Sequence, residues 1–168
     1  MSVSMYQASV PVLIRGLNNL SALLDKAAAD AAARKIAPEV LLNARLAPDM
    51  FALTRQVQIA SDSAKGCVAR LAGVEVPSYA DEEASFDELR QRIAKTVAYV
   101  QGFSAAQIDG SETREVVLKV RGEEIRFSGQ SYLLGFVLPN FYFHITTAYA
   151  ILRHNGVPLG KMDYLGGV

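Results

Sequence analysis

The sequence has few of the residues that metal and redox sites usually require. It contains one cysteine, two histidines and no tryptophan among 168 residues. The single Cys67 excludes an intrachain disulfide. Two histidines exclude a three-histidine metal site within one chain. Cys67 follows Gly66 in an apolar helical pattern, so we interpret it as a buried, inert thiol rather than a reactive one.

The sequence also lacks an excess of either charge and several well-known catalytic motifs. Lysine plus arginine equals aspartate plus glutamate, 17 against 17, so no net field attracts nucleic acid or an acidic membrane surface. There is no glycine-rich phosphate loop, no Gly-x-Ser-x-Gly motif and no cysteine pair for zinc. No positively charged segment leads into an apolar run at the start of the chain. We therefore expect a cytoplasmic protein without a nucleic-acid partner.

The longest stretch without charge lies near the end of the sequence. No Asp, Glu, Lys or Arg occurs between Phe127 and Leu152, which is the length of a membrane span. Polar groups nevertheless occur throughout it, at Gln130, Ser131, Asn140, His144, Thr146 and Thr147. A soluble helix that is apolar all round packs on several sides. We therefore predict a central buried helix from Ser131 to His154 and no membrane span; the alternative is a membrane-anchored protein of three helices.

Apolar residues at three-and-four spacing predict three further long helices. The first runs from Ser4 to Arg34, begins at a capping box and contains Pro11, which we expect to kink it. The second runs from Pro48 to about Leu71, and the third from Ser85 to about Gly102. A short helical turn is expected at Pro38–Leu42.

Between the third helix and the central helix the pattern changes from helical to alternating. Residues 115–120 and 124–127 read as two strands joined across a glycine-containing turn. Residues 74–84, with three consecutive acidic residues, read as an exposed loop. The sequence thus predicts an all-α fold: one four-helix-bundle domain over residues 1–168, with a small β-hairpin before the last helix. A lone hairpin is marginal in water, so it must lie against the helices or another chain.

The candidate site combines the central helix with the second helix. Asn140 and His144 are four residues apart and share one helix face. Gln58 and Asp62 are spaced in the same way on the second helix, with Gln56 nearby. In one interpretation His144 is a hydrogen-bonded core residue and Asp62 lies on a solvated face. In the other, Asp62 points into the bundle and orients His144 or joins it at a metal.

Three further side chains of the central helix complete these sequence-based assignments. Tyr149 is expected to add a hydroxyl to a ligand pocket in the bundle, as Tyr142 could. His154 lies beside Arg153 at the expected helix end, where a cation suits the helix dipole, so no catalytic role is assigned to it.

The order of elements and the segment from His144 to Gly156 resemble the DinB/YfiT-like superfamily of metal-dependent bundle proteins. Its members carry a His-x-x-x-His pair on the last helix, with a glycine twelve residues after the second histidine. Gly156 follows His144 by twelve residues, so the resemblance places His144 at the second histidine and Asn140 at the first.

The third histidine of that superfamily lies on the second helix and has no histidine counterpart here. Gln58 and Asp62 are the nearest candidates by location. Within the superfamily, the chain resembles a bacterial family of unknown function, through the stretches 46–51, 138–144 and 150–156. Metal-bearing relatives include thiol-dependent transferases and hydrolases, and two of their three metal positions are not histidine in this sequence.

Three functions follow from this resemblance and from the residues. The first is an uncharacterised DinB-like protein that binds a small molecule around His144 and has a degenerate metal site. The second is a metal-dependent transferase or hydrolase with a nonstandard site, and the third is a structural homodimer subunit. We expect no cofactor; if a divalent metal binds, it binds weakly at His144 and Asp62. A homodimer is expected in each case, and the sequence leaves enzymatic activity open.

Overall fold

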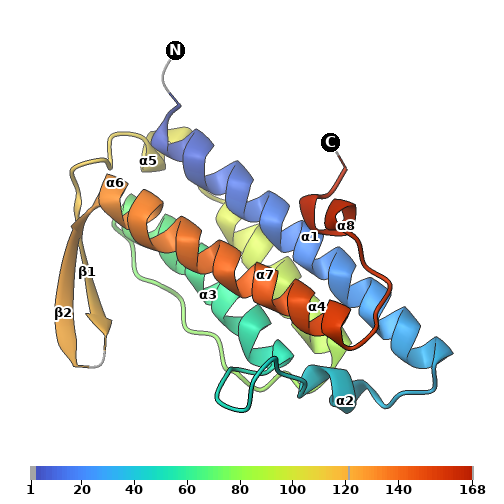
Figure 1. Ribbon diagram of the computed structural model, residues 1–168. Helices are drawn as coiled ribbons and strands as arrows, with labels where there is room; N and C mark the ends of the chain where they lie inside the picture. Colours follow the sequence, from blue (N-terminus) through green and yellow to red (C-terminus); the bar gives the residue numbers. More distant parts are fainter. Residues whose placement is uncertain (1–2, 121, 168) are drawn as a thin grey trace.

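The structure is a computed structural model that describes residues 3–120 and 122–167, and it is mostly helical with one two-stranded hairpin (Figure 1). Within this part of the chain the longest helices are α1 (Met5–Ala33), α3 (Leu53–Ala72), α4 (Phe86–Gln101) and α7 (Leu138–His154). α3 contacts α7, α4 and α1, while α1 also contacts α4 and α7. The predicted helical class with a hairpin is therefore confirmed.

α1 forms as its sequence predicts. Ser4 caps it with a full capping box, in which its hydroxyl accepts from the Gln7 amide and the Gln7 side chain accepts from the Ser4 amide. Pro11 lies within the first turns of the helix. Its apolar residues, Leu13, Leu17, Leu20 and Leu24 among them, are completely buried and provide much of the core. Beyond Arg34, Lys35 adopts a left-handed backbone with φ of 56°, which ends the helix.

The second predicted helix begins later than expected. The short helix α2 (Pro38–Leu42) lies where it was predicted, but α3 begins at Leu53 rather than at Pro48. Before it, the Met50 amide donates to the Ala47 carbonyl and forms a separate turn. At its other end α3 stops at Gly73, whose φ of 72° requires glycine or a strained residue.

α4 and the hairpin also agree with the sequence patterns. Ser85 caps α4 through its hydroxyl, which accepts from the Glu88 amide. Strands β1 (Glu115–Val120) and β2 (Glu123–Ser128) pair antiparallel. The short helices α5 (Ala105–Ile108) and α8 (Lys161–Leu165) were not predicted, because four or five residues are too few for a periodic pattern.

The central uncharged stretch is helical throughout but not uniform. A single turn, α6 (Gly129–Ser131), leads into a π-helical segment, η1 (Tyr132–Val137), and then into α7. The wide π-helical turns directly precede Pro139, which has no N–H to donate and whose ring crowds the preceding turn. Over the described part of the chain, no helix combines the length and the apolar character needed to cross a bilayer.

Candidate site around His144

His144 belongs to α7, where its side chain faces α3, and it is 7% exposed. Its Nδ1 atom is 2.6 Å from Oε1 of Gln56, in the first turn of α3. One turn earlier on α7, Asn140 donates through Nδ2 to the Ser63 hydroxyl at 2.8 Å. From the first contact to the second, the position advances along α3, from Gln56 to Ser63, and goes back along α7, from His144 to Asn140. The two helices are therefore antiparallel and joined by two polar contacts.

The Gln56 amide determines which nitrogen of His144 carries the proton. Its Nε2 donates to the Phe51 carbonyl at 3.1 Å, so its carbonyl oxygen faces the imidazole. A carbonyl oxygen only accepts, and therefore Nδ1 of His144 must be the protonated nitrogen. In the neutral ring Nε2 then keeps its lone pair, and among the described residues it has no hydrogen-bond partner.

The ring is neutral at physiological pH. Burial disfavours the charged imidazolium, and the nearby Arg55 guanidinium repels it, so the pKa of His144 falls from 6.5 to about 4. His144 therefore offers a hydrogen-bond acceptor, or a single metal ligand, and not a cation.

The surface beside this ring is aromatic. Phe143 packs edge-on against His144, with ring centroids 5.2 Å apart, and remains 55% exposed. Phe51, whose carbonyl holds Gln56, is 57% exposed, and the Arg55 guanidinium lies 6.0 Å from its ring centroid. We call Phe51, Arg55, Phe143 and His144 the aromatic patch.

The predicted pairing of Asp62 with His144 is not what the structure gives. Oδ1 of Asp62 lies 2.8 Å from Arg92 of α4 and 3.0 Å from Lys65, while His144 bonds Gln56. At 3.6 residues per turn, Asp62 is rotated about 120° around α3 from Gln56. It therefore faces α4 rather than α7.

Gln58 and Tyr149 also lie apart from the His144–Gln56 contact. Gln58 donates through Nε2 to Glu83 of the loop at 2.8 Å. The half-buried Tyr149 packs edge-on against Tyr164 of α8, with ring centroids 5.9 Å apart. His154 is exposed in the last turn of α7, as predicted.

Gln56 is the partner that the sequence patterns did not single out, although a signal exists. It lies three residues after Leu53 and four before Ala60, so it shares the buried face of α3 with them. A glutamine at 2% exposure must satisfy its amide within the protein. A polar residue at an apolar position of the helical repeat is thus the feature that points to His144.

These residues do not fit a three-ligand metal site. Gln56 directs its oxygen at Nδ1–H and not toward Nε2, and Asn140 uses its amide nitrogen on Ser63. Elsewhere in residues 3–120 and 122–167, no three His, Cys, Asp or Glu side chains converge in a way that could hold a metal ion. Cys67 is completely buried, as predicted, and burial raises the pKa of its thiol to about 12.

Comparisons with known proteins show which proteins this chain is similar to. The profile of a family described as a domain of unknown function, DUF1993, matches residues 5–165. A crystal structure of a DinB family member protein from Shewanella denitrificans is similar with a TM-score of 0.91 and 47% identity, over 97% of this chain and 92% of that one. No curated protein matches the sequence. The resemblance to DinB-like proteins is thereby confirmed.

Proposed function

We propose that this chain, which belongs to the DUF1993 family of domains of unknown function, is a DinB-like four-helix-bundle protein that binds a small molecule at His144. The observation that carries the proposal is the fixed tautomer of His144. Gln56 holds the proton on Nδ1, so Nε2 presents a lone pair to any group that reaches it. A ligand is therefore expected to donate an N–H or O–H to Nε2.

The aromatic patch indicates the rest of the ligand. Phe51 and Phe143 offer apolar surface that remains more than half exposed. Arg55 disfavours a cationic ligand here, as it disfavours the imidazolium form of His144. The ligand class that fits is a small, uncharged or anionic aromatic molecule with one hydrogen-bond donor.

The test uses nuclear magnetic resonance of the imidazole nitrogens. Phenol and benzamide each carry a donor on an aromatic ring, and toluene has the same body without a donor. We expect phenol and benzamide to shift the His144 Nε2 resonance in a saturable way, and toluene to leave it unchanged. The free protein should show His144 in the Nδ1–H form.

Two variants separate the site from unspecific binding. His144→Phe removes the acceptor and should abolish the response, whereas His154→Gln removes the exposed histidine and should leave it intact. Equal shifts from toluene, or an Nε2–H tautomer in the free protein, would contradict the proposal.

A metal-dependent transferase or hydrolase is the alternative, and one observation favours it. Metal-binding histidines commonly donate their other ring N–H to a carbonyl oxygen, as His144 does to Gln56. One imidazole is nevertheless a poor basis for tight zinc or nickel binding. We expect substoichiometric metal in protein purified without a histidine tag; one tightly held equivalent, lost in His144→Phe, would favour the enzyme instead.

A further inference from the structure

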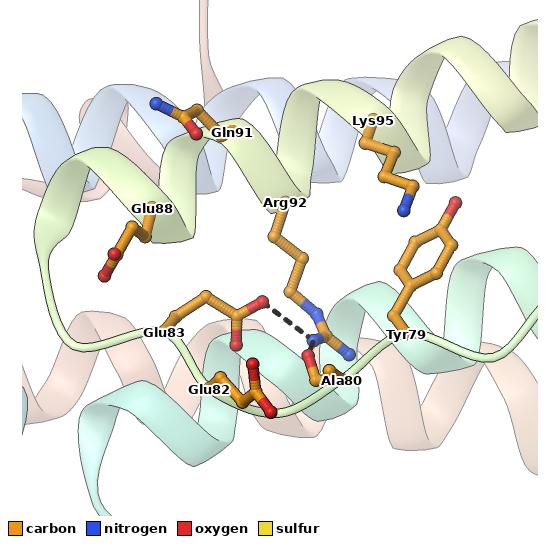
Figure 2. A pocket seen from close by; sticks show the side chains of 8 residues that line it. All are labelled: Tyr79, Ala80, Glu82, Glu83, Glu88, Gln91, Arg92 and Lys95. Atoms are coloured by element: carbon orange, nitrogen blue, oxygen red, sulfur yellow. Dashed lines mark hydrogen bonds and ion pairs between the residues drawn. The ribbon is translucent and has the colours of Figure 1, made fainter.

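A cavity lies between α4 and the loop of residues 74–85, on the α4 side of α3 (Figure 2). Its volume is about 350 Å³, within the range of small-ligand pockets. One face of α4 and a short stretch of the loop line it, through Tyr79, Ala80, Glu82, Glu83, Glu88, Gln91, Arg92 and Lys95. None of these residues belongs to the aromatic patch.

Arg92 forms the wall of this cavity and is almost completely buried, with a side chain 2% exposed. Its terminal nitrogens are fully engaged: they lie 2.8 Å from Asp62, 3.0 Å from Asp81, 2.9 Å from Glu83 and 2.8 Å from the Ala80 carbonyl. Its Nε, by contrast, has no partner among the described residues. An unsatisfied buried donor is destabilising, so the wall of this cavity contains a polar group that the fold itself leaves unpaired.

The charges that remain free are arranged at opposite ends of the cavity. Figure 2 shows Glu82 on the loop to one side of the Arg92 side chain, and Lys95 beside the ring of Tyr79 to the other side. Neither Glu82 nor Lys95 forms an ion pair with any residue the structure describes. Lys95 instead lies over the Tyr79 ring, 4.1 Å from its centroid.

We propose that this cavity binds a small zwitterion whose ammonium and carboxylate groups are several bonds apart, such as a dipeptide or an ω-amino acid. Its ammonium group lies at Glu82, where a carboxylate has no partner within the protein. Its carboxylate lies at Lys95, on the other side of Arg92. This site is independent of the ligand proposed at His144, so either can fail without the other.

The test combines calorimetry with nuclear magnetic resonance of the Arg92 Nε–H group. The probes are 6-aminohexanoate and glycylglycine, and the matched controls are hexanoate and hexylamine, which each lack one of the two charges. We expect binding of at least one zwitterion, a shift of the Arg92 Nε–H resonance when it binds, and affinity at least tenfold weaker for both single-charge controls.

Variants assign the two ends of the cavity. Glu82→Gln and Lys95→Met should each weaken zwitterion binding at least tenfold, because each removes one free charge. Glu75→Gln and Lys161→Met replace charged residues outside the cavity lining and should leave binding unchanged. Because Glu82 and Lys95 have no ion pair to lose, the folded state should survive these substitutions.

Three results would overturn the proposal. Spermidine binding more tightly than either zwitterion would make the cavity a polyamine site. Hexanoate or hexylamine binding as tightly as 6-aminohexanoate would remove the need for two charges. No binding of any probe at millimolar concentration would show that Glu82 and Lys95 are solvated surface charges rather than a binding site.

Discussion

At the scale of single residues, His144 couples protonation to folding. The folded ring takes up its proton only near pH 4, whereas an exposed histidine does so near pH 6.5. Between these values the unfolded chain binds a proton that the folded chain does not. Stability is therefore full above pH 6.5 and is lost as the pH falls toward 4, by up to about 3 kcal/mol.

The first prediction follows from this linkage. The difference in free energy of unfolding between wild type and His144→Phe should shift by about 3 kcal/mol in favour of the variant between pH 7 and pH 4. Urea unfolding at half-unit pH steps measures it. His154→Gln, which removes the exposed histidine, is the matched control and should track wild type. A pH-independent difference for His144→Phe would show that the folded ring titrates normally.

The second prediction concerns the partner of His144. In a double-mutant cycle of His144→Phe with Gln56→Leu, we expect a coupling of about 1 kcal/mol, since each single change leaves a buried polar group unpaired. The same cycle with Asp62→Asn in place of Gln56→Leu should be additive within about 0.5 kcal/mol. Coupling of His144 to Asp62 instead would support the Asp62–His144 pairing that the sequence predicts.

At the scale of elements, the loop of residues 74–85 is more than the exposed connection that its acidic composition predicts. Asp81 and Glu83 turn back to bind Arg92 of α4, and they also contact Arg55 and Gln58 of α3. A single buried guanidinium thus ties the loop to two helices. The sequence holds a sign of this, because Arg92 lies three residues after Leu89 and four before Thr96, on the buried face of α4.

The third prediction compares two arginines on the same helix. Arg92→Met should destabilise the fold by about 2–3 kcal/mol, since it leaves the loop carboxylates without their shared partner. This estimate lies below that for fully buried pairs because Asp62 and Asp81 are more than one-third exposed. Arg90→Met breaks the surface pairs with Asp25 and Asp87 and should cost less than about 1 kcal/mol.

Denaturant unfolding gives both values. Limited proteolysis should additionally cut within residues 74–85 faster in Arg92→Met than in Arg90→Met. Similar costs for the two substitutions would mean that Arg92 does not hold the loop.

Local sequence patterns predicted most helices and strands. They failed where tertiary contacts determine the start of a helix or the partner of a side chain. Capping boxes and periodicity located α1 and α4, a proline at the first helical position located α2, and alternation around a glycine located the hairpin. The start of α3 was missed because nothing in the sequence separates the turn at Ala47–Met50 from a helix start. The partner of His144 was missed because it depends on how α3 is rotated, which no single-helix pattern states.

At the scale of the whole molecule, the outer face of α7 and η1 is the surface without charge. Leu134, Pro139, Tyr142 and Thr146 are all exposed there, and no charged residue occurs between Phe127 and Leu152. In Figure 1 this helix lies at the front of the bundle, between α1 and α3, which it contacts. Monomeric proteins rarely leave a contiguous apolar face uncovered.

The last prediction is a homodimer in solution at micromolar concentration, formed across this face. Closed two-fold dimers are the commonest oligomers, and two copies of an uncharged helix face can cover each other without burying charge. Leu134→Lys and Tyr142→Lys place a cation on side chains that are 51% and 42% exposed, and each should yield monomers by light scattering. Val40→Lys is the matched control, because Val40 is 56% exposed on α2, away from this face, and the variant should remain dimeric. A monomer mass for wild type would contradict the dimer itself, and three dimeric variants would place the interface on another surface.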